Sequence, residues 1–299
     1  MEKLLLTGAS GFIGRNIRRL LELTYEVTSC GIAPDDEVRA DLRTDIPALP
    51  GRYDVVLHAC GKAHIVPRTM AERQEFLDVN YMGTVNLCKA LELCGVPKAI
   101  VYISTVAVYG CDFGEMITEL HPLNGSSPYA ISKIMAERHL SEWCGSHGVT
   151  LGILRASLIA GKNAPGNLGA MVEGIRRGIY LNIAGGKAAK SILMADDIVR
   201  ILPELAARGG IYNVCDTAQP TMGEISELVA RQLGRRRPPS IPYPVAWCMA
   251  KVGDLLGAKA PFNSYKLAKM TQSLTFSNAK ARSELNWTPL DVVTHYHIQ

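Results

Sequence analysis

The first half of the chain alternates short, almost continuous apolar runs with longer segments whose apolar residues recur every three or four positions. KLLLTG (residues 3–8), DVVLHAC (54–60) and KAIVYIST (98–105) are runs of the first kind, and residues 14–23 and 128–148 are segments of the second kind. Strands of a parallel sheet form continuous apolar runs because helices cover both faces of the sheet, whereas helical spacing marks one buried face. The pattern predicts an α/β fold with a doubly wound parallel sheet.

Three glycines stand where the first predicted strand passes into the first predicted helix. Gly8, Gly11 and Gly14 lie three residues apart in TGASGFIG (residues 7–14), called the glycine turn below. In such a turn the first glycine permits a tight bend, the second lets a pyrophosphate approach the backbone, and the third packs the helix closely on the strand. The helix N-terminus adds free N–H groups and a partial positive charge. We therefore expect a Rossmann-type dinucleotide site here.

The pattern loosens after about residue 156, where glycine and proline interrupt it in AGKNAPGN (160–167) and RRRPPSIPYP (235–244). Strand-like and helix-like stretches still follow. We expect residues 1–156 to form the dinucleotide-binding domain. Residues 157–299 are expected to form a smaller mixed α/β substrate-binding region over the carboxyl ends of the strands. A segment at about 191–217 is expected to return to the main sheet.

Composition and charge narrow the class of protein. Of the 299 residues, 47% are hydrophobic and 20% are charged, which is typical of a globular protein, and a net charge of +4 does not indicate nucleic-acid binding. No apolar run of membrane-spanning length and no signal peptide is visible, so we expect a cytoplasmic protein without a membrane partner. The eight cysteines form no C-x-x-C pair and do not cluster with histidines, which predicts reduced thiols and no metal site.

Two segments of the second half have more than one interpretation. GRRRPP (234–239) is expected to be a solvated surface turn, with a phosphate or membrane contact as the less favoured alternative. VAWCMAKVGDLLG (245–257) has apolar residues at helical spacing and is expected to be core or a dimer face rather than a membrane anchor.

A group of hydroxyl and amine side chains has the spacing of a proton-transfer site. Tyr129 and Lys133 in SPYAISKIMAE (127–137) are four residues apart on a predicted helix and therefore share one face. Tyrosine has a pKa of about 10 in water, and a nearby lysine together with a positively charged nicotinamide can lower it. Ser104 and Thr105 end the preceding apolar run. A hydroxyl at this place would complete a proton-transfer set above the dinucleotide site.

Taken in order, these motifs resemble those of the extended short-chain dehydrogenases/reductases, and specifically the NAD-dependent epimerase/dehydratase family that acts on nucleotide sugars. The resemblance covers nearly the whole chain. It includes the glycine turn, ADLRTD (40–45), HACG (58–61), NYMGTVNL (80–87), STVAVYG (104–110), YAISK (129–133) and FSNAKARSELNWTP (276–289). As an ordered set these motifs are highly specific.

The resemblance implies roles for individual residues. Tyr129 would be the catalytic acid/base, Lys133 would lower its pKa and bind the nicotinamide ribose, and Thr105 would occupy the catalytic Ser/Thr position. The cofactor-binding residues would be Gly8, Gly11, Phe12, Ile13, Gly14, Asp41, Leu42, Ala59, Cys60, Gly61, Asn80, Ser104, Tyr129 and Lys133. The substrate-binding residues would be Thr105, Asn167, Leu168 and Lys190, the last where the family more often has an arginine that binds a diphosphate.

Two departures from the family pattern bear on the cofactor and the reaction. Gly31 stands at the end of the second strand, where NAD-dependent members usually have Asp or Glu to hold the ribose hydroxyls. Without that carboxylate a 2′-phosphate is not repelled, so the cofactor is NAD or NADP, with Arg15, Arg39 or Arg43 as candidates for its contact. Val-Ala (106–107) follows the catalytic threonine where 4,6-dehydratases have Asp-Glu, which argues against a dehydratase.

The implied function is hydride transfer at C4 of a UDP-hexose. A 4-epimerase would return the hydride to the opposite face of the same sugar, and a 4-ketoreductase would reduce a 4-keto sugar once; the sequence leaves both open. The alternatives are a non-catalytic NAD(P)-binding regulator and a reductase of a non-sugar carbonyl. The expected partner is a small-molecule nucleotide sugar, nucleic acid is not expected, and the resemblance implies a homodimer formed through two helices, one of them carrying Tyr129.

Overall fold

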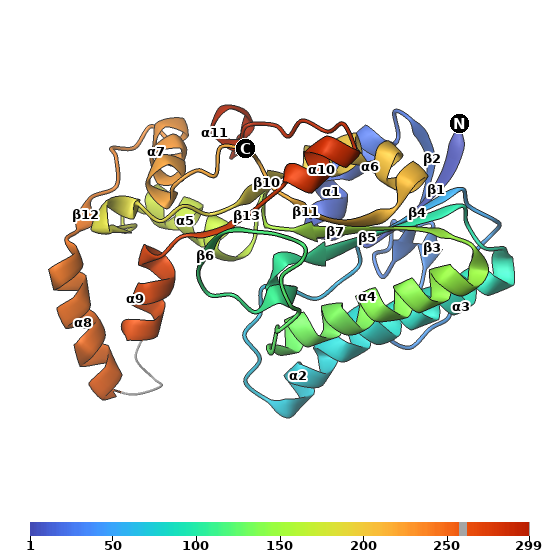
Figure 1. Cartoon of the computed structure of the whole chain (residues 1–299), viewed down its shortest axis with the longest axis horizontal. Helices are drawn as coiled ribbons and strands as arrows, with labels where there is room; N and C mark the ends of the chain where they lie inside the picture. The colour runs from blue at the N-terminus through green and yellow to red at the C-terminus, as the bar shows by residue number, and fades with distance from the viewer. Residues whose placement is uncertain (257–261, 299) are drawn as a thin grey trace.

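The computed structural model describes residues 1–256 and 262–298 and contains one large parallel sheet between two layers of helices (Figure 1). Its strand order is β11-β7-β5-β4-β1-β2-β3, and every adjacent pair is parallel. The strands are β1 (Glu2–Thr7), β2 (Tyr25–Gly31), β3 (Val38–Arg39), β4 (Val55–His58), β5 (Ala99–Thr105), β7 (Thr150–Ala156) and β11 (Gly210–Val214). The predicted Rossmann-type sheet is confirmed. Its strand order reverses beside β1, which opens a crevice at the carboxyl ends of the strands.

Alternate residues of β1 enter two different cores, because the sheet is covered on both faces. Leu4 and Leu6 pack in the core that includes residues of α1 (Phe12–Leu21) and α6 (Asp196–Arg208). Leu5 packs in the core that includes residues of α3 (Gly83–Cys94) and α4 (Pro128–His147). In Figure 1 these two pairs of helices lie on opposite sides of the sheet. This double burial explains the continuous apolar runs of the sequence.

The helical segment between β4 and β5 is divided in the structure. It consists of α2 (Met70–Leu77), a π-helical turn at Asp78–Met82, and α3. Asn80 lies in the π turn, where its side chain is buried and bonded to three groups described below. A π turn inserts one extra residue into a helix, often near functional sites, and apolar spacing alone does not reveal it.

The rest of the chain forms a smaller mixed α/β region. Its strands form two-stranded parallel pairs, β8 (Leu158–Ala160) with β10 (Ile192–Met194), β9 (Asn182–Ile183) with β12 (Ser240–Ile241), and β6 (Gly114–Ile117) with β13 (Leu274–Phe276). Its helices are α5 (Gly166–Arg176), α7 (Met222–Gln232), α8 (Tyr243–Leu256), α9 (Ser264–Thr271) and α11 (Val292–His295), whereas α10 (Ala279–Glu284) packs Ala281 into the core of the main sheet. Within the segment 191–217, α6 packs on the main sheet and β11 pairs with β7, whereas β10 lies outside that sheet. The assignment of this region to substrate binding stays a prediction.

The two regions differ in how their helices are placed. In Figure 1, α8 and α9 extend away from the main sheet at one end of the molecule.

Among the helices of the described residues, none combines the length and the apolar character needed to cross a bilayer.

Candidate active site

A cleft of about 1490 Å³ lies at the carboxyl ends of β1, β4 and β5 and extends toward α5 and α9. Typical small-molecule pockets have volumes of about 300–1000 Å³, so this cleft has room for a dinucleotide and a second ligand. Within the part of the chain that the structure describes, no cluster of His, Cys, Asp and Glu could hold a metal ion.

The glycine turn has the geometry expected for a pyrophosphate site. Gly8 has φ of +74°, and a Cβ there would lie 2.8 Å from the backbone nitrogen of Cys60. A Cβ on Gly11 would lie 3.1 Å from the Gly8 carbonyl oxygen, and one on Gly14 would lie 2.4 Å from the same atom. No side chain caps the start of α1, and Gly11 and Phe12 line the cleft. The uncapped helix N-terminus and the close backbone approach therefore fit a dinucleotide phosphate.

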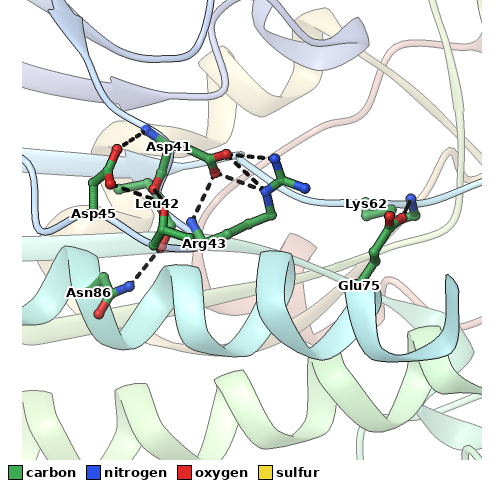
Figure 2. Close-up of polar contacts among 8 residues, drawn as sticks. Asp41, Leu42, Arg43, Asp45, Lys62, Glu75 and Asn86 are labelled. Atoms are coloured by element: carbon green, nitrogen blue, oxygen red, sulfur yellow. Dashed lines mark hydrogen bonds and ion pairs between the residues drawn. The ribbon is translucent and has the colours of Figure 1, made fainter. Parts of the chain in front are cut away.

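The end of the cleft beyond β2 has the groups expected around an adenosine (Figure 2). The carboxylate of Asp41 accepts hydrogen bonds from Nε and Nη2 of Arg43 at 3.0 and 2.6 Å. These bonds hold the pKa of Asp41 below its ordinary value. Asn86 donates to the Leu42 carbonyl oxygen at 2.8 Å and so fixes the backbone beside it. Asp41 is thus paired with Arg43, and both line the cleft.

At the end of β2, the space that a side chain at residue 31 would occupy is filled by another residue. A Cβ on Gly31 would lie 2.5 Å from Oδ2 of Asp36, so the Asp36 carboxylate occupies the space of a side chain at residue 31. Asp36 is buried and does not line the cleft. Arg43 lines the cleft and Arg39 lines a pocket that adjoins it, whereas Arg15 lines neither. Two of the three candidate arginines therefore lie at the adenosine end.

The structure brings the three predicted catalytic residues together. Thr105 ends β5, Tyr129 and Lys133 lie in the first two turns of α4, and all three line the cleft. A hydrogen bond with Thr105 lowers the pKa of Tyr129, but burial has the larger effect and the net pKa is raised. Nζ of Lys133 donates to the Ile103 carbonyl oxygen at 2.7 Å and lies 4.4 Å from the ring centre of Tyr102.

The ammonium of Lys133 donates to the Ile103 carbonyl oxygen, and burial lowers the pKa of Lys133 itself to about 8. Burial also raises the pKa of Tyr129 in the protein alone. The expectation that Lys133, together with the positive charge of a nicotinamide, lowers the pKa of Tyr129 stays a prediction.

A buried ion pair that sequence reasoning missed connects the elements that carry the catalytic residues. Arg155 of β7 pairs with Glu137 of α4 at 2.7 Å, and both side chains are 4% exposed. Glu137 also accepts a hydrogen bond from Ser104 of β5, and Arg155 donates to the hydroxyl of Tyr109 at 3.1 Å. The signal in the sequence is a glutamate on the buried face of α4, eight residues after Tyr129. The pair fixes α4 against the end of β5.

Three predicted binding residues do not reach the cleft. Asn80 accepts a hydrogen bond from the backbone nitrogen of Lys62 at 2.7 Å and donates to the Ser132 hydroxyl at 2.9 Å, so it positions the loop after β4. The ammonium of Lys62 pairs with Glu75 of α2 (Figure 2). Leu168 is fully buried in the apolar core of the second region, and Gly14 lies behind the cleft. The other predicted site residues line it: Gly8, Gly11, Phe12, Ile13, Asp41, Leu42, Ala59, Cys60, Gly61, Ser104, Thr105, Tyr129, Lys133, Asn167 and Lys190.

Two lysines lie together at the end of the cleft opposite the adenosine pocket. Lys190 donates to the Gln272 carbonyl oxygen at 2.9 Å, and Lys269 of α9 pairs with Asp112 at 2.8 Å. Burial, then repulsion from Lys269, lowers the pKa of Lys190. Sequence reasoning missed Lys269, because no motif marks α9. Two cations on one wall suit an anionic group such as a diphosphate.

A comparison with known families decides the class of protein. The model of the NAD-dependent epimerase/dehydratase family matches residues 4–215, which is more than half of the chain. The chain belongs to this family. This epimerase/dehydratase family member is therefore an enzyme with a nicotinamide dinucleotide cofactor, as the glycine turn indicates.

Curated relatives of this family member include both epimerases and a reductase. It is 29% identical to N-acetyl-alpha-D-glucosaminyl-diphospho-ditrans,octacis-undecaprenol 4-epimerase of Escherichia coli O157:H7, with 94% of this chain and 89% of the relative covered. It is 26% identical to the UDP-glucose 4-epimerase of Vibrio cholerae, with 96% and 91% covered. It is also 26% identical to the GDP-6-deoxy-D-mannose reductase of Pseudomonas aeruginosa, with 77% and 79% covered.

Solved structures of similar fold have sequence identities near one fifth, so they support the fold alone. RMD from Pseudomonas aeruginosa, complexed with NADPH, gives a TM-score of 0.73 at 21% identity, with 99% of this chain and 96% of that chain covered. The UDP-glucose 4-epimerase of Thermotoga maritima, with UDP-glucose, gives a TM-score of 0.73 at 19% identity, with 97% and 95% covered.

Proposed function

We propose that this enzyme transfers a hydride at C4 of a UDP-hexose, as a 4-epimerase or a 4-ketoreductase. The observation that carries the proposal is the meeting of Thr105, Tyr129 and Lys133 in one cleft with the glycine turn. Relatives named as 4-epimerases and as a sugar reductase support chemistry at a hexose.

Each of the three residues has a defined task in this reaction. When bound, the nicotinamide accepts or supplies the hydride. Tyr129 removes the proton of the C4 hydroxyl as the sugar is oxidised and returns it as the ketone is reduced. Thr105, which is hydrogen-bonded to Tyr129, orients the C4 oxygen. Lys133 holds the nicotinamide ribose and, once its ammonium leaves the Ile103 carbonyl, favours the phenolate of Tyr129.

The cleft disfavours the other reactions considered. Val106 and Ala107 line it next to Thr105, so no carboxylate is present where 4,6-dehydratases have their Asp-Glu pair. Lys190 and Lys269 suit a diphosphate and would have no role with a non-sugar ketone. A non-catalytic regulator would not need Thr105, Tyr129 and Lys133 in one cleft.

The adenosine end favours NADP over NAD. The carboxylate of Asp36 lies behind Gly31 and outside the cleft, whereas Arg43 and Arg39 border the cleft and its adjoining pocket. A 2′-phosphate requires cationic partners, which Arg43 and Arg39 supply. Asp41 also lines the cleft and pairs with Arg43 at 2.6 Å, so a 2′-phosphate would replace Asp41 as the partner of Arg43.

A second candidate substrate carries a lipid, in place of uridine, on its diphosphate. The Escherichia coli relative is named for a substrate whose diphosphate carries undecaprenol. In this chain Lys269 lies on α9, which packs against the exposed apolar helix α8. A polyprenyl chain leaving the lysines over α9 would meet that apolar surface, which favours a lipid-linked sugar as the alternative to a UDP-hexose.

Two further expectations remain proposals. A homodimer would form through α4 and a neighbouring helix, as the family resemblance implies. The cytoplasmic location also rests on the sequence alone.

The direct test follows nicotinamide absorbance, which reports a ketoreductase, and the identity of the sugar product, which reports an epimerase, with the purified enzyme, NAD(H) or NADP(H), and UDP-hexoses or their 4-keto forms. We expect turnover with at least one sugar and a loss of about 10²–10⁴-fold in kcat for Tyr129→Phe. Tyr296→Phe is the matched control, because Tyr296 is buried in the apolar core of the second region, and it should keep wild-type turnover. Near-normal turnover in Tyr129→Phe, or neither an absorbance change nor a new sugar product across the panel with both NAD(H) and NADP(H), would overturn the proposal.

A further inference from the structure

An ion pair lies on the wall of the cleft opposite the adenosine pocket. Nζ of Lys269 on α9 is 2.8 Å from Oδ1 of Asp112, which lies in the segment between β5 and β6. Both residues line the cleft, as does Lys190, whose ammonium donates to the Gln272 carbonyl oxygen. The two lysines that suit a diphosphate therefore share their wall with a carboxylate. An anionic ligand at this wall has to compete with Asp112.

The backbone on both sides of Asp112 is held in place. Gly110 has φ of +72°, and a Cβ there would lie 2.6 Å from a backbone carbonyl oxygen. The backbone nitrogen of Gly114 donates to the Ser273 carbonyl oxygen at 3.0 Å, and β6, which begins at Gly114, pairs with β13. Because β13 closely follows α9 in the chain, this pairing keeps Asp112 within reach of Lys269.

Both members of the pair are charged. Burial alone would raise the pKa of Asp112, but hydrogen bonds with Lys269 and Tyr265 and the charges of both lysines outweigh it, so this pKa is lowered. Burial alone would lower the pKa of Lys269, but hydrogen bonds with Asp112 and Tyr265 outweigh it, so this pKa is raised. The contact is therefore an ion pair at neutral pH.

The pair is weak enough for a ligand to open it. The side chains of Lys269 and Asp112 are 44% and 43% exposed, and ion pairs that water reaches this well contribute little free energy. A diphosphate diester is a dianion whose oxygens can accept hydrogen bonds from both lysines, and hydrogen bonds between charged groups are the stronger kind. Exposure also allows the Asp112 side chain to turn toward solvent once Lys269 is released.

The two lysines differ in what holds them. Lys190 donates to a neutral carbonyl oxygen, so its positive charge is available to a ligand. Lys269 is paired with Asp112, so its charge becomes available only after that pair opens. A ligand without a strongly anionic group can contact Lys190 but gains nothing by opening the pair.

We propose that Asp112 is a specificity-determining residue of this wall: its carboxylate holds Lys269 in the free protein, and a ligand must displace it to bind both lysines. The wall then favours a dianionic diphosphate over weakly charged groups. This inference rests on the proposed diphosphate at Lys190 and Lys269. It applies equally to a nucleotide sugar and to a lipid-linked sugar, because both carry that group.

The test is isothermal titration calorimetry of the protein saturated with NADPH, so that the glycine turn is occupied. The ligands are UDP and farnesyl diphosphate, and the one that binds more tightly identifies the source of the diphosphate. We expect Asp112→Asn to bind that ligand about three- to fivefold more tightly, because the pair no longer has to open. When Lys269→Ala is also present, Asp112→Asn should change the affinity by less than about 1.5-fold, since the two residues act as a pair.

Glu173→Gln is the matched control. Glu173 pairs with Arg176 and Arg177 on α5, its side chain is 42% exposed, and it lies outside the cleft. This variant loses an ion-paired carboxylate of similar exposure, so it should bind both ligands like the wild type. Thermal unfolding checks that every variant is folded.

The possible outcomes separate the roles that Asp112 can have. Unchanged binding by Asp112→Asn would overturn the proposal, and weaker binding would make Asp112 a direct contact of the ligand instead. A gain that persists with Lys269→Ala would also contradict it, because Asp112 would then act by repelling the ligand rather than by holding Lys269. Absence of binding of both ligands by the wild type would refute it together with the assignment of this wall to a diphosphate. Because no turnover is measured, failure of the C4 reaction and failure of this proposal are distinguishable.

Discussion

The buried polar groups of the dinucleotide domain and the exposed apolar groups of α8 are opposite departures from the ordinary distribution of residues. In the first, Glu137 and Arg155 are almost fully buried and satisfied by each other. In the second, Leu255 and Val252 face solvent without a partner among the described residues. The first arrangement holds α4 against the sheet, and the second leaves apolar side chains exposed. Satisfied buried charges and exposed apolar groups thus belong to different regions of one chain.

The largest expected effect is on the free energy of unfolding, which should respond very differently to substitutions in the two regions. Glu137→Ala leaves the guanidinium of Arg155 buried without its counter-charge, and breaking such a pair costs about 3–5 kcal/mol in the free energy of unfolding. Leu255→Ser, at an exposed position, should change it by less than about 0.5 kcal/mol. Urea unfolding measures both. Equal effects of the two substitutions would contradict the division between the regions.

The next largest effect is on sugar binding by Lys190 and Lys269. Lys190→Ala and Lys269→Ala each remove a charged hydrogen-bond donor from the wall of the cleft, worth about 1.5–3 kcal/mol. We expect a roughly 10–100-fold rise in the KM for the sugar with little change in kcat. Lys187→Ala is the control, because Lys187 is exposed and outside the cleft. A matching rise in that control would refute the assignment.

The pH dependence should report the buried lysine. Burial lowers the pKa of Lys133 to about 8, so the charged form, which we propose holds the nicotinamide ribose, is lost as the pH rises above that value. The kcat/KM for the cofactor, which reports groups of the free enzyme, should fall about tenfold per pH unit on this side. Arginine stays charged there, so Lys133→Arg should shift the alkaline limb to higher pH. An unchanged limb in this variant would exclude Lys133 as its origin.

The smallest expected effect is on the choice of cofactor. Arg43→Ala removes a guanidinium at the adenosine end of the cleft and should raise the KM for NADPH about tenfold while leaving that for NADH nearly unchanged. Arg15→Ala should alter neither, since Arg15 lies outside the cleft. Steady-state kinetics with both cofactors decide the question, and a parallel loss with NADH would argue against phosphate recognition.

The sequence predicted those features that depend on local spacing. The strands were found because burial on both faces makes their residues continuously apolar, and Tyr129 and Lys133 because one helix turn separates them. Lys269, Asp36 and the Glu137–Arg155 pair were missed, since each acts on a partner that is distant in sequence or lacks a motif. Residues 245–257 were expected to be core or a dimer face, yet Val252 and Leu255 are exposed, because periodicity does not say what covers a helix face.

The central claim, that hydride moves at C4 of the sugar, is tested most directly by following deuterium. A UDP-4-keto-hexose, or its lipid-linked equivalent, is incubated with the enzyme and a nicotinamide cofactor deuterated at the transferable position, and the product is examined by NMR. The account predicts deuterium at C4, in one configuration for a ketoreductase and in both for an epimerase. Deuterium at any other carbon, or its absence from a product that has formed, would contradict it.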